Sequence, residues 1–139
     1  MVAIRPAQAS DLPAISALDA RLTGVDKPDY WRDMLAPDRH FLVSENDAGT
    51  LLGFIAGEVR AWEFGQPAAG WVFAIQIDPR QRQRGVGSAL FEALVTLFRQ
   101  QGVTRVRTLV DRKDHLILSF FRAQGMVAGP SLQLDMDVA

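Results

Sequence analysis

The sequence has no cysteine, only one tyrosine and no long apolar run, and the missing features remove whole classes of function. Without cysteine the chain has no disulfide, no thiolate ligand for a metal and no thiol nucleophile. No apolar stretch reaches the length of about 18 residues that a membrane-spanning helix needs. The first six residues also lack the apolar run of a secretory signal. We therefore expect a cytoplasmic protein without a membrane segment or a metal site.

An excess of either charge is also missing, since 15 basic residues face 16 acidic ones for a formal net charge of -1. A general nucleic-acid binder relies on many cationic contacts to phosphates, so this balance argues against that function. One local cluster of positive charge consists of Arg80, Arg82 and Arg84. Any anion site must therefore depend on a local cluster of positive charge and not on the net charge of the chain.

The 139 residues, 48% of them hydrophobic, suit one globular domain, and we expect residues 1–139 to form it. Apolar and β-branched runs predict strands, and apolar stripes at three- and four-residue spacing predict helices. The expected strands are 2–5, 40–45, 51–59, 71–77, 103–110 and 132–138. The expected helices are one that begins at Ser10-Asp11 and ends before Gly24, then 28–36, 85–101 and 114–124. The order βααβββαβαβ predicts an α/β fold, more strictly an α+β mixed sheet flanked by helices.

Two single strands and one pair of strands carry more specific expectations. The nearly unbroken apolar run 71–77 is typical of a strand buried on both faces. The alternating pattern of 132–138 indicates a half-exposed final strand. Residues 40–59, with a turn at 46–49, predict a β-hairpin.

The junction between strand 71–77 and the following helix has the chemistry of an anion site. The first backbone N–H groups of a helix have no partner within it, and the helix dipole adds positive potential there. Gly85 and Gly87 would allow a bulky anion to approach the backbone, and Arg82 and Arg84 could add charged hydrogen bonds. A P-loop needs Lys after its glycines and a dinucleotide-binding turn needs a third small residue where Leu90 stands, so neither pattern fits.

At this junction, Arg82-x-x-Gly85-x-Gly87 after Ile77-Asp78-Pro79 resembles the acetyl-CoA-binding motif of the GCN5-related N-acetyltransferases (GNAT family). Residues 4–7, 52–54 and 121–126 fall where other elements of that family would lie. The resemblance implies the GNAT acyltransferase fold, acetyl-CoA as cosubstrate and an enzyme that moves the acetyl group directly to an amine-bearing acceptor.

The resemblance also implies which residues bind the cofactor. Backbone N–H groups from Gln83 to Ser88 would hold the pyrophosphate, and Ile75 and Ile77 would pair through their backbone with the pantetheine arm. A backbone N–H near Ile75 would polarise the thioester carbonyl. The full expected set is Ile75, Gln76, Ile77, Arg82, Gln83, Arg84, Gly85, Val86, Gly87, Ser88, Asp114 and Phe121.

The sequence departs from the family pattern at two of these positions. Phe121 stands where the family commonly has a tyrosine that protonates the leaving thiolate, and Asp114 replaces an asparagine. Phe121 cannot donate a proton. Ser119, His115 and Tyr30 are substitute candidates, although each has an ordinary structural explanation as well.

Candidates for the base and for the acceptor site come from strand ends and from the region between the first two helices. Glu58 and Glu63 could accept the proton of the amine, although strand glutamates commonly face solvent. The residues expected to contact the acceptor are Tyr30, Trp31 and Trp71, with Asp26, Asp29 and Asp33 beside the first two. Trp62 and Phe64 near Trp71 suit an acceptor platform, a subunit contact or core packing.

Two rival functions share the same cofactor turn. One is an acyl-CoA-binding or regulatory module without catalysis, and the other is an enzyme that uses a different acyl-CoA. The acceptor cannot be read from the sequence, because such specificity lies in loops grafted on the fold. Edge strands and tryptophans are compatible with a homodimer.

Overall fold

The computed structural model describes residues 3–82 and 84–139, which divide into two compact units. The N-terminal unit is Met1–Leu109 and the C-terminal unit is Val110–Ala139.

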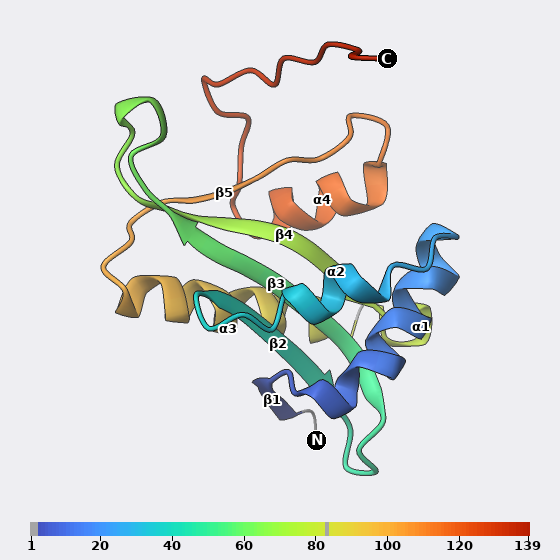
Figure 1. The fold of residues 1–139 in the computed structure, drawn as a ribbon. Helices are drawn as coiled ribbons and strands as arrows, with labels where there is room; N and C mark the ends of the chain where they lie inside the picture. Colours follow the sequence, from blue (N-terminus) through green and yellow to red (C-terminus); the bar gives the residue numbers. More distant parts are fainter. Residues whose placement is uncertain (1–2, 83) are drawn as a thin grey trace. The chain divides into compact units, whose positions relative to one another are not determined.

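The N-terminal unit contains a five-stranded sheet in the order β1-β2-β3-β4-β5 (Figure 1). Its strands are β1 Ala3–Pro6, β2 Arg39–Glu45, β3 Leu51–Arg60, β4 Ala69–Ile77 and β5 Val106–Thr108. Neighbouring strands are antiparallel except β4 and β5, which are parallel. The mixed sheet and the β2–β3 hairpin are therefore confirmed, although β5 is shorter than the expected strand 103–110.

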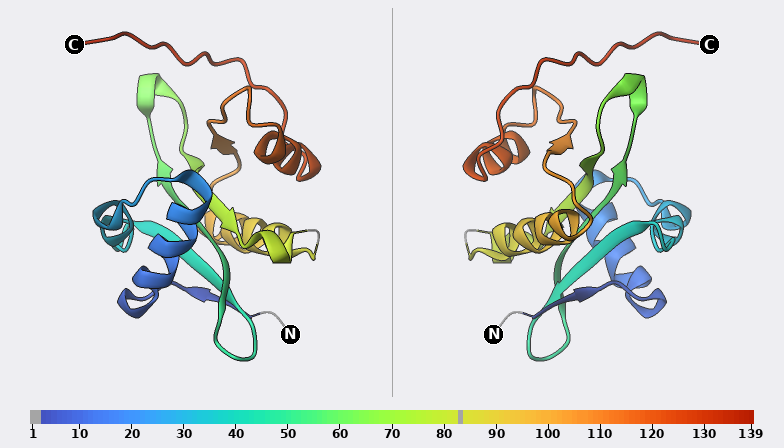
Figure 2. Two further views of the ribbon diagram at one scale, coloured as in Figure 1. Left: turned by 90° about the vertical axis from the view of Figure 1, so that its right-hand side faces the viewer. Right: turned by 90° about the vertical axis from the view of Figure 1, so that its left-hand side faces the viewer.

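Helices lie on both faces of this sheet. The α-helices are α1 Leu12–Thr23, α2 Pro28–Asp33 and α3 Val86–Gln100, and the 3₁₀ helices are η1 Ala9–Asp11, η2 Glu63–Gly65 and η3 Pro79–Gln81. The views in Figure 2 show α1 and α2 on one face and α3 on the other. Gly24, in the left-handed conformation with φ of 78°, ends α1 as the sequence predicts.

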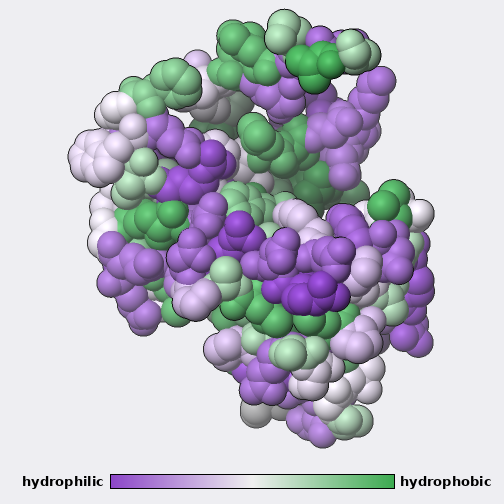
Figure 3. All heavy atoms as spheres, in the orientation of Figure 1, coloured by the Kyte–Doolittle hydropathy of each residue, from purple (hydrophilic) through white to green (hydrophobic). Residues whose placement is uncertain are grey.

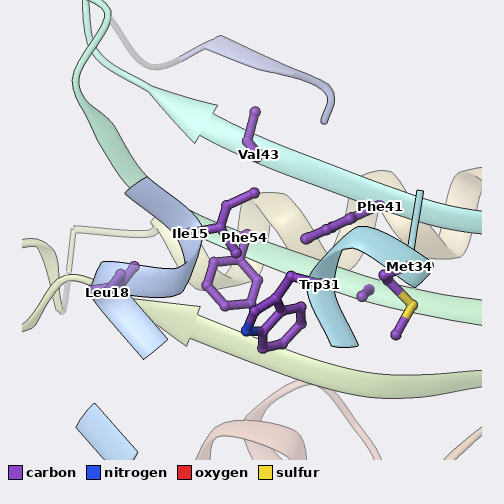
Figure 4. Packing of buried hydrophobic residues seen from close by; sticks show 8 residues of the cluster. Ile15, Leu18, Trp31, Met34, Phe41, Val43 and Phe54 are labelled. Carbon is purple, nitrogen blue, oxygen red and sulfur yellow. The ribbon is translucent and has the colours of Figure 1, made fainter. Parts of the chain in front are cut away.

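The core under α1 and α2 forms because their apolar stripes face β2 and β3. Figure 4 shows Ile15 and Leu18 of α1 and Trp31 of α2 against Phe54 of β3. The rings of Trp31 and Phe54 meet edge to face, with centroids 4.9 Å apart. Such packing fixes α1 and α2 against the sheet.

The prediction that 71–77 is buried on both faces is wrong. Of these residues only Val72 is buried, and Trp71 and 73–77 are half-buried. The physical reason is the length of the neighbouring strand, since β5 pairs only with Gly70, Trp71 and Val72. An unbroken apolar run describes the side chains and not how far a partner strand extends.

In the C-terminal unit the structure has one helix, α4 His115–Ala123, and no strand among residues 110–139. The predicted final strand 132–138, and with it the last β of the expected order, is therefore wrong. Its alternating apolar side chains, at Leu132, Leu134, Met136 and Val138, are each more than 80% exposed. Alternation makes a segment suitable for a sheet, but a strand also needs a paired neighbour, and this segment has no strand pairing.

The loop between β3 and β4 presents two aromatic residues to solvent. Trp62 is 72% exposed and Phe64 is fully exposed, and both have left-handed backbone, with φ of 63° and 51°. That conformation is costly for bulky residues. Core packing is therefore not the role of either side chain.

Candidate active site

The central feature of the candidate site is the point where β4 and β5 separate. Their ladder ends at the Val72–Thr108 pair, where the Thr108 hydroxyl donates a hydrogen bond of 2.9 Å to the Val72 carbonyl. Phe73 is an extra residue on β4, since the register against β3 passes from Ala56–Ala74 to Gly57–Val72. This β-bulge increases local twist where the two strands part.

Beyond the bulge, backbone groups of β4 face away from β3. The Asp78 N–H donates to the Leu52 carbonyl at 2.8 Å, so the hydrogen-bonded residues opposite β3 are Asp78, Gln76 and Ala74. Antiparallel pairing alternates, which turns the N–H and C=O of Ile75 and Ile77 to the other edge. Within the described part of the N-terminal unit no strand pairs with that edge beyond Val72. It can accept an extended ligand as an added strand.

The turn after β4 begins with a fixed carboxylate. Asp78 accepts hydrogen bonds from the Arg80 backbone N–H at 3.0 Å and from the Arg80 side chain at 3.1 Å. These bonds lower the pKa of Asp78, mainly through the side-chain bond, and raise the pKa of Arg80. Arg80, which belongs to the cluster of positive charge in the sequence, is thus occupied within the turn by Asp78.

Gly85 makes the sharp entry into α3. It is the N-cap residue with φ of 81°, a conformation that L side chains rarely adopt, and a Cβ there would meet no atom of the described residues within 4 Å. The open space means that glycine is needed here for backbone conformation, and it leaves the backbone accessible. Val86, 2% exposed, anchors the first turn of α3.

The two other arginines of the turn, Arg82 and Arg84, are exposed. Their backbone N–H groups donate to the Pro79 and Gln81 carbonyls at 3.4 and 3.3 Å, while neither guanidinium has a hydrogen bond or ion pair with a residue that the structure describes. Gly87 and Ser88 follow in the first turn of α3. Gln83, which the sequence also places in this turn, lies outside the described residues.

Glu58 lies in β3 between Arg39 of β2 and Trp71 of β4. One of its oxygens is 3.6 Å from Arg39 Nε, and the two side chains are 21% and 33% exposed. Arg39 Nε is buried and has no hydrogen-bond partner among the described residues, while another nitrogen of the same guanidinium donates to the Asp33 carbonyl at 3.0 Å. Glu58 is therefore held loosely beside a cation.

Glu63 is in a different environment, in η2 within the exposed loop between β3 and β4. Its carboxylate is 2.6 Å from Arg60, whose guanidinium also lies over the Trp71 ring at 5.4 Å from the centroid. The structure therefore brings Glu58, Trp71 and Arg60 close together, with Glu63 at the margin.

A surface hollow lies beside Arg39, lined by Tyr30, Arg32, Asp33, Leu35, Ala36 and Arg39. Tyr30 is 41% exposed, and burial raises the pKa of its phenol. Asp29 forms an ion pair with Arg32, so part of the expected acidic lining is neutralised locally. Figure 3 shows mainly hydrophilic residues over α2 in this view.

Trp31, the other expected acceptor contact on α2, belongs to the core and is 1% exposed. Its indole N–H donates to the Asp19 carboxylate at 3.2 Å. Asp19 was missed in the sequence, although a signal exists. It falls within the apolar stripe Ile15, Leu18 and Leu22 of α1, where a carboxylate needs a partner.

The expected site residues of the C-terminal unit all lie at or on α4. The Asp114 side chain caps this helix by accepting from the Ile117 N–H at 3.1 Å, which is a structural use for an aspartate there. Ser119 is exposed, and the Phe121 ring is 5.3 Å from that of Phe120. Among residues 3–82 and 84–139, no group of three or more side chains is arranged to hold a metal, and no helix could cross a membrane.

Comparison with known proteins identifies the family. The sequence profile described as the acetyltransferase (GNAT) family matches residues 8–126. Mycothiol acetyltransferase of Kocuria rhizophila is 32% identical over 83 residues, which are 60% of this chain and 27% of that protein. The enzyme of the same name from Propionibacterium freudenreichii is 33% identical over 84 residues, 60% and 26% respectively. The chain thus spans about a quarter of these curated relatives.

Solved structures agree on the fold. Aminoglycoside 6'-N-acetyltransferase AAC(6')-Ih from Acinetobacter baumannii superposes with a TM-score of 0.86 at 15% identity, over all of both chains. Aminoglycoside N-acetyltransferase AAC(6')-Iy in complex with CoA also gives 0.86, at 17% identity, over 100% of this chain and 96% of that one. By sequence profile and by fold, the chain belongs to the GNAT acetyltransferase family.

Proposed function

We propose that this protein transfers the acetyl group of acetyl-CoA directly to an amine acceptor. The observation that carries the proposal is the open edge of β4 beyond Val72, at the end of the strand that precedes the turn before α3. An extended chain with a thiol end and a diphosphate end fits an open strand edge followed by a helix N-terminus.

The backbone of Ile75 and Ile77 supports the pantetheine part of the proposal. Their N–H and C=O groups face the open edge, so the amide groups of pantetheine can replace the missing strand. One such N–H beside the thioester would stabilise the oxyanion that forms when the amine attacks. The Gln76 side chain instead faces α1, where it donates to Asp19.

The turn supports the pyrophosphate part. The N-terminal amides of α3 lack partners in the preceding turn of the same helix, and Gly85 leaves them accessible. Arg82 and Arg84, both exposed, supply positive charge beside them. The proposed set of contacts is the one expected from the sequence, from Arg82 to Ser88.

For proton removal we propose Glu58 as the base. A primary alkylamine has a pKa of about 10.4 in water, so its nitrogen must lose a proton before attack. Glu58 is partly exposed, and its 3.6 Å contact with Arg39 can loosen when a cationic amine approaches. Glu63 is the second candidate, but its tighter ion pair with Arg60 and its place on the loop favour it less.

The leaving thiolate needs no strong acid in this proposal. A thiol resembling cysteine has a pKa of about 8.5, so CoA can depart largely as thiolate. Phe121 cannot protonate it, and Ser119 remains the proposed substitute donor. Phe121→Tyr tests whether a proton donor at position 121 assists departure of the thiolate. We expect turnover to rise several-fold while the affinity for CoA is unchanged.

The proposal is tested by following thiol release from acetyl-CoA with a panel of primary amines. The chain has no cysteine, so a thiol reagent detects CoA alone. Amine-dependent release with a matching acetylated product supports transfer. Binding of acetyl-CoA without release of CoA favours a non-catalytic acyl-CoA-binding module. Faster release of CoA from propionyl- or succinyl-CoA than from acetyl-CoA favours an enzyme that uses a different acyl-CoA.

The family match from residue 8 to residue 126 includes parts of both units and supports residues 1–139 as one GNAT domain. We also propose a cytoplasmic location, no nucleic-acid partner and a homodimer. The exposed Trp62 and Phe64 support the last of these.

A further inference from the structure

A buried carboxylate that the proposed reaction does not use lies on α1. Asp19 is 2% exposed, and both of its oxygens are engaged. One oxygen accepts from the Trp31 indole N–H at 3.2 Å and forms an ion pair with the ammonium of Lys27. The other accepts from the Gln76 side chain of β4 at 3.4 Å. Figure 4 shows the Trp31 nitrogen on the side of its ring that faces α1.

Stability alone does not explain such a cluster. Removing a carboxylate from water is strongly unfavourable, and apolar residues of similar volume commonly replace a buried ion pair without loss of stability. The cluster also joins four separate parts of the fold, namely α1, the segment that leads into α2, α2 itself and β4. A polar arrangement of this kind is more specific than packing requires.

The cluster has the composition of an ammonium site. The Lys27 ammonium meets a carboxylate and also lies 5.5 Å from the centroid of the Trp31 ring. A carboxylate beside an aromatic face is a combination that recognises a compact cation. Only two of the 15 basic residues are lysines, Lys27 and Lys113, and one of them is at this position. The broad, planar guanidinium of arginine would not replace it.

Lys27 is attached in a way that would allow it to leave. Its side chain is 36% exposed, and it follows residues 24–26, which are exposed and have no regular structure. Trp31 and Gln76, in contrast, lie in a helix and a strand. The carboxylate, the ring and the amide are thus fixed parts of the site, and the lysine is its exchangeable occupant.

We propose that Asp19, Trp31 and Gln76 form a binding site for a primary ammonium group, which Lys27 fills from within. When the segment before α2 moves, an ammonium group of the acceptor takes the place of Lys27. Gln76 lies between Ile75 and Ile77, so this site adjoins the strand assigned to the thioester. The inference about the acceptor rests on the proposed acetyl transfer.

The chemistry limits which ammonium can bind. A carboxylate keeps a neighbouring amine protonated, and a protonated amine cannot attack a thioester. The group bound at Asp19 is therefore a second ammonium of the acceptor and not the reacting nitrogen. The acceptor class that fits is a diamine or polyamine.

The first test removes the internal occupant. Lys27→Ala is expected to lower the melting temperature by about 5–10 °C, because Asp19 loses its ammonium partner. Propylammonium chloride should restore about half of that loss, whereas tetramethylammonium chloride at equal ionic strength should not, since it has no N–H donor. Lys113→Ala, the matched variant of the only other lysine, should not respond to either salt.

The double variant Asp19→Asn/Lys27→Ala shows whether the Asp19 carboxylate binds the propylammonium. Without that carboxylate, propylammonium should no longer raise the melting temperature. If Lys27→Ala does not fold alone, the folded fraction after refolding with each salt gives the same comparison. An equal response of Lys27→Ala to both salts, or an undiminished response of the double variant, would overturn the site.

The second test examines displacement in the unaltered chain. With ¹⁵N-lysine labelling only the Lys27 and Lys113 ammonium groups are observed, and 1,3-diaminopropane dihydrochloride should shift the Lys27 resonance alone. A Lys27 resonance that is unchanged at 100-fold excess over protein would overturn the exchange. Neither test measures acetyl transfer, so the site can fail while the enzyme is active, or hold while transfer fails.

Discussion

The two halves of β4 have the same kind of sequence but different surroundings. From Gly70 to Val72 the strand lies between β3 and β5, and Phe98 of α3 packs against Gly70. From Phe73 to Ile77 it keeps β3 on one edge only, and its side chains are half-buried. The paired half contributes stability, and the open half leaves backbone hydrogen-bonding groups that we propose bind the ligand. In this proposal, function depends on where a neighbouring strand stops.

The largest expected effect distinguishes the two edges of the open half. Gln76→Pro removes an N–H that faces β3, and we expect it to destabilise the fold by about 3 kcal/mol or more. Ile75→Pro removes an N–H on the free edge, so it should cost clearly less stability yet weaken CoA binding at least tenfold. Urea unfolding measures the stability of each variant, and calorimetry measures its affinity for CoA. Equal losses of stability in the two variants would contradict the assigned edges.

The next effect concerns the turn that follows the open half. Gly85→Glu places a carboxylate among the amides proposed to bind pyrophosphate and strains a residue with φ of 81°. We expect CoA affinity to fall about 100-fold, equivalent to about 2.7 kcal/mol. Gly49→Glu, in a turn with φ of 79°, has similar strain and is the matched control, with unchanged affinity.

A smaller effect is expected in the paired half. A Cβ at Gly70 would lie 2.2 Å from the Phe98 ring, so Gly70→Ala should reduce the free energy of unfolding by about 1–3 kcal/mol. Gly129→Ala meets nothing within 4 Å and should have little effect. If Gly70→Ala reduced the free energy of CoA binding by more than it reduced the free energy of unfolding, the division of roles along β4 would be wrong.

The sequence could predict most elements of this fold because their signals are local. The helix 85–101 has a long apolar stripe, and the turn around Gly85 has glycines and arginines at a recognisable spacing. The bulge at Phe73 and the end of β5 have no such local signal, because both depend on pairing between distant segments. The same holds for the link between Gln76 and Asp19, which are 57 positions apart. The failed strand 132–138 shows that an apolar pattern does not supply a partner.

The smallest effect lies at the other edge of the sheet. Two hydrogen bonds of 2.8 Å from Arg5 lower the pKa of Asp11 below 3.8. A depressed folded-state pKa stabilises the fold fully above the unfolded pKa, and that contribution is lost as pH falls through the folded value. Asp11→Asn should lower stability at pH 7 by about 1 kcal/mol and flatten the acid limb below pH 3.8. CoA affinity at neutral pH should not change.

The most direct test of the open edge is amide hydrogen exchange with and without acetyl-CoA. The Ile75 and Ile77 amides should exchange at least tenfold more slowly when the cofactor binds, because pantetheine supplies the acceptors that β5 does not. The Gln76 amide, already bonded to β3, should change little. If acetyl-CoA binds and the exchange of Ile75 and Ile77 is unaltered, the cofactor does not lie along β4.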